Sequence, residues 1–191
     1  MPSKWYERKL KSGRLTVFNG AGAWSKHVTQ AMSDFSGLSI KVVLDTDADK
    51  NKADIVVMLS NGKSNSFSWG GNVIKSDFDA AGTHGQAGSF LDSRGRVEQV
   101  VIFLPEKLKG VSDDIKVLVV IHELIHACGL SEKNDHDPVG GVLYKKLQLV
   151  YGKLIEPTTD KKLQGMPPVR VGTWTQGKMA ELWTIEDKKK N

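Results

Sequence analysis

The alternation of apolar and polar residues along this chain predicts a small sheet covered by helices. Five short stretches are rich in β-branched and other apolar residues and are bounded by turn-forming residues, which is typical of strands. We expect the second and third of them to lie in the interior of the sheet, because they are largely apolar. The five predicted strands span residues 14–18, 40–44, 54–59, 86–91 and 97–104, and residues 19–22 are predicted to form a turn.

Two amphipathic helices are predicted from the spacing of apolar residues. The first follows the turn at 19–22 and presents a stripe at i, i+3, i+4, i+7, i+8 and i+11, formed by Trp24, His27, Val28, Ala31, Met32 and Phe35. Because His27 lies on that stripe, we expect it to pack in the core and not to bind a metal. The second helix is expected near the end of the chain, at 175–183, with an apolar side formed by Met179, Leu182 and Trp183.

A further helix is predicted after Ser112, which can cap it, with Asp113 and Asp114 placing negative charge in the first turn. Positions 115, 118, 119, 122, 125 and 126 then recur at helical spacing. Gly129 marks the end of the helix, because a residue without a β-carbon readily takes positive φ.

This helix contains the sequence His122-Glu123-Leu124-Ile125-His126, which is a zinc-hydrolase signature. Histidines at i and i+4 share a helix face, with Cβ atoms about 5–6 Å apart, so both rings can reach one metal ion. Glu123 is rotated by about 100° from His122 and can address a metal-bound water. The next histidine is His136, and three neutral imidazoles plus a water form a catalytic zinc site with an open position.

The run HELIHACGL, followed by His-Asp-Pro, resembles the metzincin metallopeptidases and is nearest the matrixin-like branch. The resemblance implies an α+β fold with a mixed, mostly parallel five-stranded sheet, two long helices and a small C-terminal subdomain ending in a helix. We therefore expect one zinc-peptidase domain over 1–191. Its N-terminal subdomain would span 14–129, with the zinc helix, and its C-terminal subdomain 130–191.

The chain departs from the metzincin pattern after Gly129. The family spacing would place the third metal ligand at position 132, which is Glu132 in this chain. We expect His136 to serve instead, after a four-residue insertion, while Glu132 and the neighbouring Asp135 and Asp137 stay open as alternatives. The resemblance also implies a methionine-containing turn beneath the metal, for which Leu143 and Met166 are incomplete matches.

The implied function is that of a zinc-dependent endopeptidase. Zn²⁺ would lower the pKa of its water to about 7, and Glu123 would act as the general base. A peptide or protein substrate is expected to lie extended along an edge strand at 86–91. Tyr144 is a possible oxyanion donor, although packing in a loop is the favoured interpretation. The alternatives are a catalytically inactive metzincin-like zinc-binding module and a zinc hydrolase acting on a non-protein amide.

Composition limits the partners. The chain is 39% hydrophobic and 26% charged, as in globular domains, and it has no apolar run of the ~20 residues that a membrane helix needs. The net charge of +5 is dispersed, without the basic and aromatic patches of nucleic-acid-binding proteins. We expect a monomer that binds neither nucleic acid nor membrane. The start of the chain lacks a signal-like segment, which favours cytoplasmic synthesis.

Three other candidate positions have structural explanations. Cys128 is the single cysteine, which excludes an internal disulfide, and we expect it to be a small buried side chain. The acidic run 45–49 fails the calcium-loop pattern, because Lys50 stands where glycine is required. His84 lies in a glycine-rich loop and is expected to be a solvent or rim residue.

Overall fold

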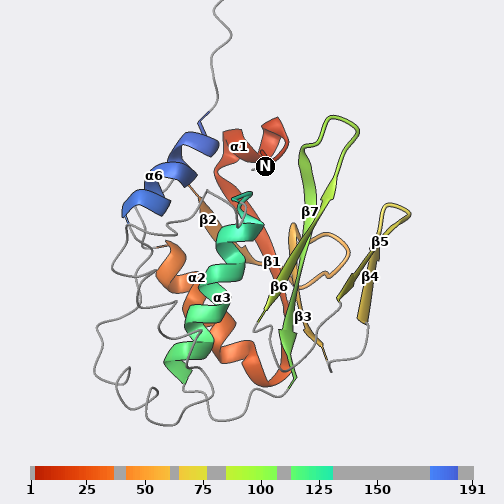
Figure 1. The fold of residues 1–191 in the computed structure, drawn as a ribbon, viewed down its shortest axis with the longest axis vertical. Coiled ribbons are helices and arrows are strands. Elements are labelled where there is room, and N and C mark those ends of the chain that lie inside the picture. The colour runs from red at the N-terminus through yellow and green to blue at the C-terminus, as the bar shows by residue number, and fades with distance from the viewer. Residues whose placement is uncertain are drawn as a thin grey trace, which may run out of the picture.

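The computed structural model describes residues 3–36, 42–60, 65–76, 85–106, 113–130 and 173–184. Figure 1 shows how these segments are arranged around one central sheet. In chain order, the elements are α1 (Glu7–Ser12), β1 (Arg14–Gly20), η1 (Gly22–Trp24), α2 (Ser25–Ser36), β2 (Val43–Thr46), β3 (Ile55–Ser60), β4 (Asn65–Trp69), β5 (Asn72–Ser76), β6 (Gln86–Leu91), β7 (Val97–Pro105), α3 (Asp113–Ala127) and α6 (Thr173–Leu182).

The central sheet has five strands in the order β2-β1-β3-β7-β6. The pairs β1–β2, β1–β3 and β3–β7 are parallel, and β6 runs antiparallel to β7 at one edge. The prediction of an α+β fold with a mixed, mostly parallel five-stranded sheet is confirmed. The prediction that the second strand lies inside the sheet is wrong: β2 forms the other edge, where Val43 is 37% exposed.

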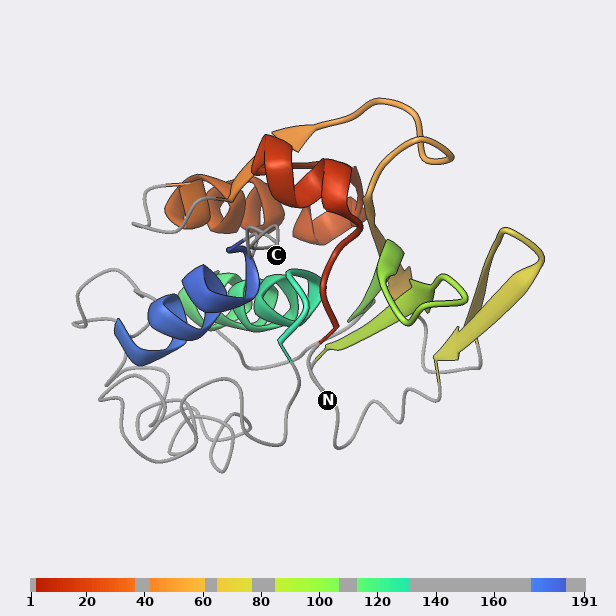
Figure 2. The ribbon, with the colours of Figure 1, turned by 90° about the horizontal axis from the view of Figure 1, so that it is seen from above.

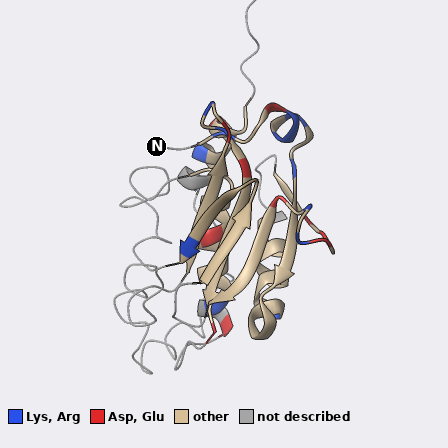
Figure 3. Ribbon diagram, turned by 90° about the vertical axis from the view of Figure 1, so that its right-hand side faces the viewer, with Lys and Arg blue, Asp and Glu red and all other residues tan. Residues whose placement is uncertain are grey.

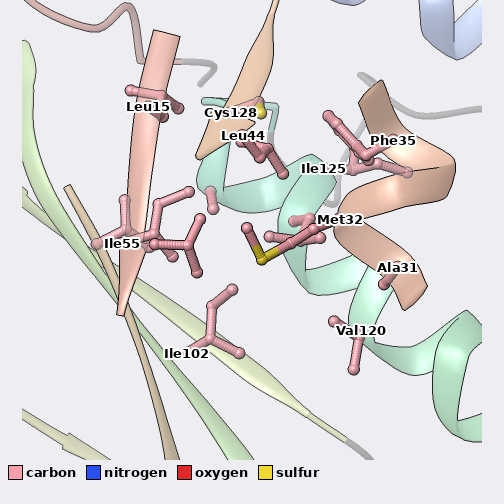
Figure 4. Close-up of a cluster of buried hydrophobic side chains, with 14 of the residues drawn as sticks. Leu15, Ala31, Met32, Phe35, Leu44, Ile55, Ile102, Val120, Ile125 and Cys128 are labelled. Carbon is pink, nitrogen blue, oxygen red and sulfur yellow. The ribbon is translucent and has the colours of Figure 1, made fainter. Parts of the chain in front are cut away.

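The helices cover one face of this sheet. The predicted stripe on α2 is buried throughout, and α2 packs against α3. In Figure 4, Met32 of α2 and Val120 of α3 lie among side chains from the strands, including Leu15, Ile55 and Ile102. The same cluster includes Met179 and Leu182 of α6 and the next residue, Trp183, as the sequence predicts.

A β-hairpin covers the opposite face of the sheet, and the sequence analysis missed it. Strands β4 and β5 pair antiparallel through Gly70 and Gly71, both at positive φ, which is what a two-residue hairpin turn requires. Figure 2 shows the hairpin on the side of the sheet away from the helices. Alternate residues of β3 and β7 point to this side and form a second, smaller core with the hairpin and β6: Ala53, Val56, Phe67, Phe90, Val101 and Phe103.

Other boundaries differ in small ways from the predictions. Strand β1 continues to Gly20, so the predicted turn at 19–22 begins later than expected. The short helix α1 was not predicted. Lys9 of this helix forms an ion pair of 2.5 Å with the buried carboxylate of Asp54, and the same carboxylate accepts a hydrogen bond from the backbone N–H of Thr16. Residue Ile40, the predicted start of the second strand, lies outside the described residues.

Charged residues of both signs are scattered over the described surface. In Figure 3, the strands are mostly uncharged, and the basic and acidic residues do not gather on one face. None of the helices described by the structure combines the length and apolar character needed to cross a membrane.

Candidate active site

The candidate site lies on α3, whose local sequence explains where the helix begins and ends. Asp113 is the first residue of the helix and accepts hydrogen bonds from Lys26 and from the ring of His27, so α2 holds its first turn. At the other end, Gly129 adopts φ 107°, as predicted. The N–H groups of Gly129 and Leu130 donate to the carbonyls of His126 and Ile125, which is the Schellman pattern of helix termination.

His122 and His126 converge on one face of α3. Their Nε2 atoms are 3.0 Å apart, and their ring planes are perpendicular, with centroids separated by 4.6 Å. Two nitrogens bound to a tetrahedral zinc at ~2.0–2.1 Å would be roughly 3.3 Å apart. The pair is therefore within a few tenths of an ångström of the separation that a shared metal requires, and both rings are partly exposed.

The orientation of the His126 ring is fixed by the backbone that follows the helix. Nδ1 of His126 is 2.9 Å from the carbonyl oxygen of Leu130. A carbonyl only accepts hydrogen bonds, so Nδ1 must carry the proton, and the Nε2 lone pair is directed towards His122. This is the arrangement that metal-binding histidines generally show, with one ring nitrogen held by a backbone or carboxylate acceptor.

Glu123 is buried to 4% exposure and lies against the residue that precedes the edge strand β6. A β-carbon added to Gly85 would be 2.5 Å from Oε1 of Glu123. Glycine at position 85 therefore allows the carboxylate to lie across the start of β6. The sequence analysis missed this role of Gly85, because only the packing of α3 beside β6 reveals it.

The remaining predicted site residues lie outside the described residues. They are the third-ligand candidates His136, Glu132, Asp135 and Asp137, the methionine-turn candidates Leu143 and Met166, and Tyr144 and His84. Within the described ranges, no group of three or more His, Cys, Asp or Glu side chains is placed to hold a metal ion. The two imidazoles on α3 nevertheless fit zinc in donor type and separation.

Two further candidates have structural roles, as predicted. His27 is 3% exposed, stacks edge-on against Trp24 and contacts Asp113 through Nε2, so it joins α2 to α3. Cys128 is fully buried at the end of α3, and burial raises the pKa of its thiol. A buried thiol of raised pKa is a poor nucleophile and a poor metal ligand at neutral pH.

Comparisons with known proteins do not assign a function to this chain. No protein-family model matches the chain, and no curated protein sequence matches it significantly. A solved structure described as "Structure of myroilysin" aligns with a TM-score of 0.41 and 17% identity, over 91% of this chain and 73% of its own. Similarity at this level assigns neither family nor activity, so the functional argument depends on the residues of α3 and β6.

Proposed function

We propose that the protein is a zinc-dependent endopeptidase of the metzincin type, in which His122 and His126 bind the metal and Glu123 is the general base. The observation that carries the proposal is the convergence of the two Nε2 atoms at 3.0 Å, one residue from a buried carboxylate. Structural zinc sites are usually closed by four protein ligands and need no such carboxylate. The matrixin-like branch rests on the sequence resemblance alone.

The residues of the site have different roles in the proposed reaction. His122 and His126 would hold the metal, with His126 oriented by the Leu130 carbonyl. When bound, zinc supplies Lewis-acid chemistry, polarising a carbonyl and making a water more acidic. Glu123 accepts the proton of the attacking water and passes it to the leaving amine, which requires a carboxylate that alternates between its two protonation states.

The third ligand is proposed to be His136. A third imidazole keeps the positive charge of the site uncompensated, which favours acidification of water, whereas Glu132 would add negative charge and weaken that effect. Asp135 and Asp137 are the remaining alternatives within the same stretch of sequence.

The substrate is proposed to be a peptide that lies extended along β6. Within the described residues, β6 is hydrogen-bonded to β7 and to no other strand, so it forms one edge of the described sheet, which is the edge proposed to pair with substrate. Addition of an extended peptide to such an edge satisfies backbone groups on both sides. Because β6 begins next to Gly85, a peptide paired with it would pass close to Glu123.

The deciding experiment combines metal analysis with cleavage of a broad peptide library by the wild type, Glu123→Gln and Glu181→Gln. We expect one zinc ion per chain in all three proteins. Glu123→Gln should cleave about 10²–10⁴-fold more slowly, because an amide cannot accept the proton. Glu181 is an exposed residue of α6, paired with Lys178, and serves as the matched control.

Two results would redirect the assignment. A wild-type protein that binds no zinc would contradict the proposal at its foundation. Zinc binding with equal cleavage by wild type and Glu123→Gln, or with no cleavage by either, would favour the inactive zinc-binding module. Hydrolysis of small amides without peptide cleavage would favour the non-protein amide hydrolase.

A further inference from the structure

The carbonyl groups at the end of α3 accept hydrogen bonds from residues outside the helix. A helix leaves its last carbonyls without partners inside the helix, and they must be satisfied by other groups when they are buried. The Schellman turn satisfies the carbonyls of Ile125 and His126. The carbonyls of Ala127, Cys128 and Gly129 still need donors from elsewhere, because all three residues are buried.

Each of these three carbonyls accepts a hydrogen bond from a distant part of the chain. The indole N–H of Trp5 donates to Ala127 at 2.9 Å, and the indole N–H of Trp183 donates to Cys128 at 3.0 Å. The backbone N–H of Ser3 donates to Gly129 at 2.9 Å. The N-terminal segment and the residue after α6 therefore meet at the last turn of the helix that carries the histidine pair.

The position of this turn determines the position of the His126 ring. The Leu130 carbonyl, which accepts the hydrogen bond from His126 Nδ1, comes directly after the three residues held by the indoles and by Ser3. There is little room for adjustment, since a β-carbon at Gly129 would collide with the carbonyl oxygen of Ser3. A shift of this segment would move the acceptor that orients His126.

We propose that Trp5 and Trp183 are positioning residues for His126, acting through the carbonyls of Ala127 and Cys128. The inference rests on the proposed function, since it treats His126 as a metal ligand. The two indoles hold the 127–130 segment so that the Leu130 carbonyl keeps His126 with its proton on Nδ1 and its Nε2 lone pair directed at the metal position. Groups that orient a metal-binding histidine from outside the ligand set commonly affect metal affinity by 10–100-fold.

The competing explanation is that both tryptophans only fill the core. Both are almost fully buried, Trp5 at 1% and Trp183 at 3% exposure, and both belong to the main apolar cluster. A large buried ring stabilises the fold whether or not its N–H has a partner. The test must therefore remove the N–H donor while keeping the ring. It must also measure zinc binding and the state of His126 separately from the stability of the fold.

Trp5→Phe and Trp183→Phe remove the donor and keep most of the aromatic volume. We expect each to lower zinc affinity about 10-fold, the lower end of the range for orienting groups, and to change the visible spectrum of the cobalt-substituted protein. Val101→Ala is the control, because Val101 is buried in the separate cluster on the hairpin side of the sheet. It should lower thermal stability without changing zinc affinity or the cobalt spectrum.

The tautomer of His126 in metal-free protein gives a readout that does not depend on zinc. In the wild type, the side-chain ¹⁵N shifts should show a protonated Nδ1, and both tryptophan variants should show a mixture of tautomers. If a phenylalanine variant does not fold, site-specific 3-benzothienylalanine, in which sulfur replaces the indole N–H, provides the same test with the ring size retained.

The outcomes separate this inference from the proposed function. Unchanged zinc affinity and an unchanged His126 tautomer in both tryptophan variants would overturn the positioning role while leaving the peptidase proposal intact. Absence of zinc binding in the wild type would overturn the peptidase proposal, and the tautomer comparison would still decide whether the indoles orient His126.

Discussion

Gly85 and Glu123 lie so close together that position 85 has no space for a side chain. A β-carbon there would be 2.5 Å from Oε1 of Glu123 and 2.7 Å from its Cγ. The carboxylate is thus held between α3 and the start of the edge strand. The residue proposed as general base therefore lies against the residue that directly precedes the strand proposed to bind substrate.

Gly85→Ala should reduce peptidase activity by about 10²-fold, because the added methyl group displaces the Glu123 carboxylate, and misplacement by about 1 Å can have an effect of this size. Zinc binding should be retained, since neither histidine is altered. Metal content and kcat/KM measured on the same preparation check both expectations. Unchanged activity would show that Glu123 works from another position.

Gly177→Ala is the matched control for this glycine substitution. Gly177 lies in the exposed part of α6, and an added β-carbon meets no atom within 4 Å. Alanine should raise the free energy of unfolding by up to about 1 kcal/mol through helix propensity. Denaturant unfolding should show this gain, and activity should stay at the wild-type level.

His122→Ala and His126→Ala should each abolish stoichiometric zinc binding, because a missing imidazole leaves too few donors for a stable site. His27→Gln is the control: His27 is a buried histidine of α2, and it contacts Asp113 at the opposite end of α3 from the pair. That variant should retain one zinc ion per chain. Full metal occupancy in both alanine variants would contradict the proposed ligand pair.

His136→Ala should weaken zinc binding and remove activity, whereas Glu132→Ala should change both only slightly. The expectation follows from assigning the third ligand to an imidazole. X-ray absorption on the zinc-loaded protein provides the direct measurement, with three zinc–nitrogen distances of about 2.0–2.1 Å expected. An oxygen ligand that disappears in Glu132→Ala would transfer the assignment to Glu132.

Asp113→Asn should lower Tm by up to about 2–4 °C at pH 7, because Asp113 is exposed and an exposed charge pair contributes at most about 1 kcal/mol. Hydrogen bonds from Lys26 and then His27 hold the pKa of Asp113 well below its usual value, and Lys116 adds a second ammonium group at 3.6 Å. This contribution is present above the unfolded-state pKa of about 3.9 and is lost as pH falls through the lower folded-state pKa.

The measurement for Asp113 is a pair of thermal unfolding series from pH 7 downwards. The difference in Tm between wild type and Asp113→Asn should stay constant down to about pH 4 and narrow below it. A difference that is already halved at pH 6 would contradict the assignment of this stability to the ionised carboxylate of Asp113.

The helices could be predicted from the sequence because their signals are local. The stripe from Trp24 to Phe35 repeats within a few residues, and α3 has acidic residues at its start and Gly129 after its end. Strand positions were predicted to within a few residues for the same reason. The position of β2 at the edge of the sheet could not be predicted in this way, because strand order depends on pairing between distant segments.

The hairpin had a local signal that went unused. Gly70-Gly71 stands between an alternating polar and apolar stretch at 65–69 and the β-branched pair Val73-Ile74, which is a two-residue hairpin pattern. The contacts around the candidate site, by contrast, are tertiary. The hydrogen bond of Trp5 to the Ala127 carbonyl joins residues 122 positions apart, and no periodicity within either segment encodes it.

The two faces of the sheet are buried by cores of very different size, and this difference should divide the molecule into two units of local stability. Among the residues that the structure describes, the helix side buries 28 in one cluster and the hairpin side buries six. Amide hydrogens of β4 and β5 should therefore exchange with solvent through a low-energy opening that leaves α3 and the central strands protected. The face of α3 that carries His122 and His126 would stay folded during such openings, while the β4–β5 hairpin detaches from the sheet and returns.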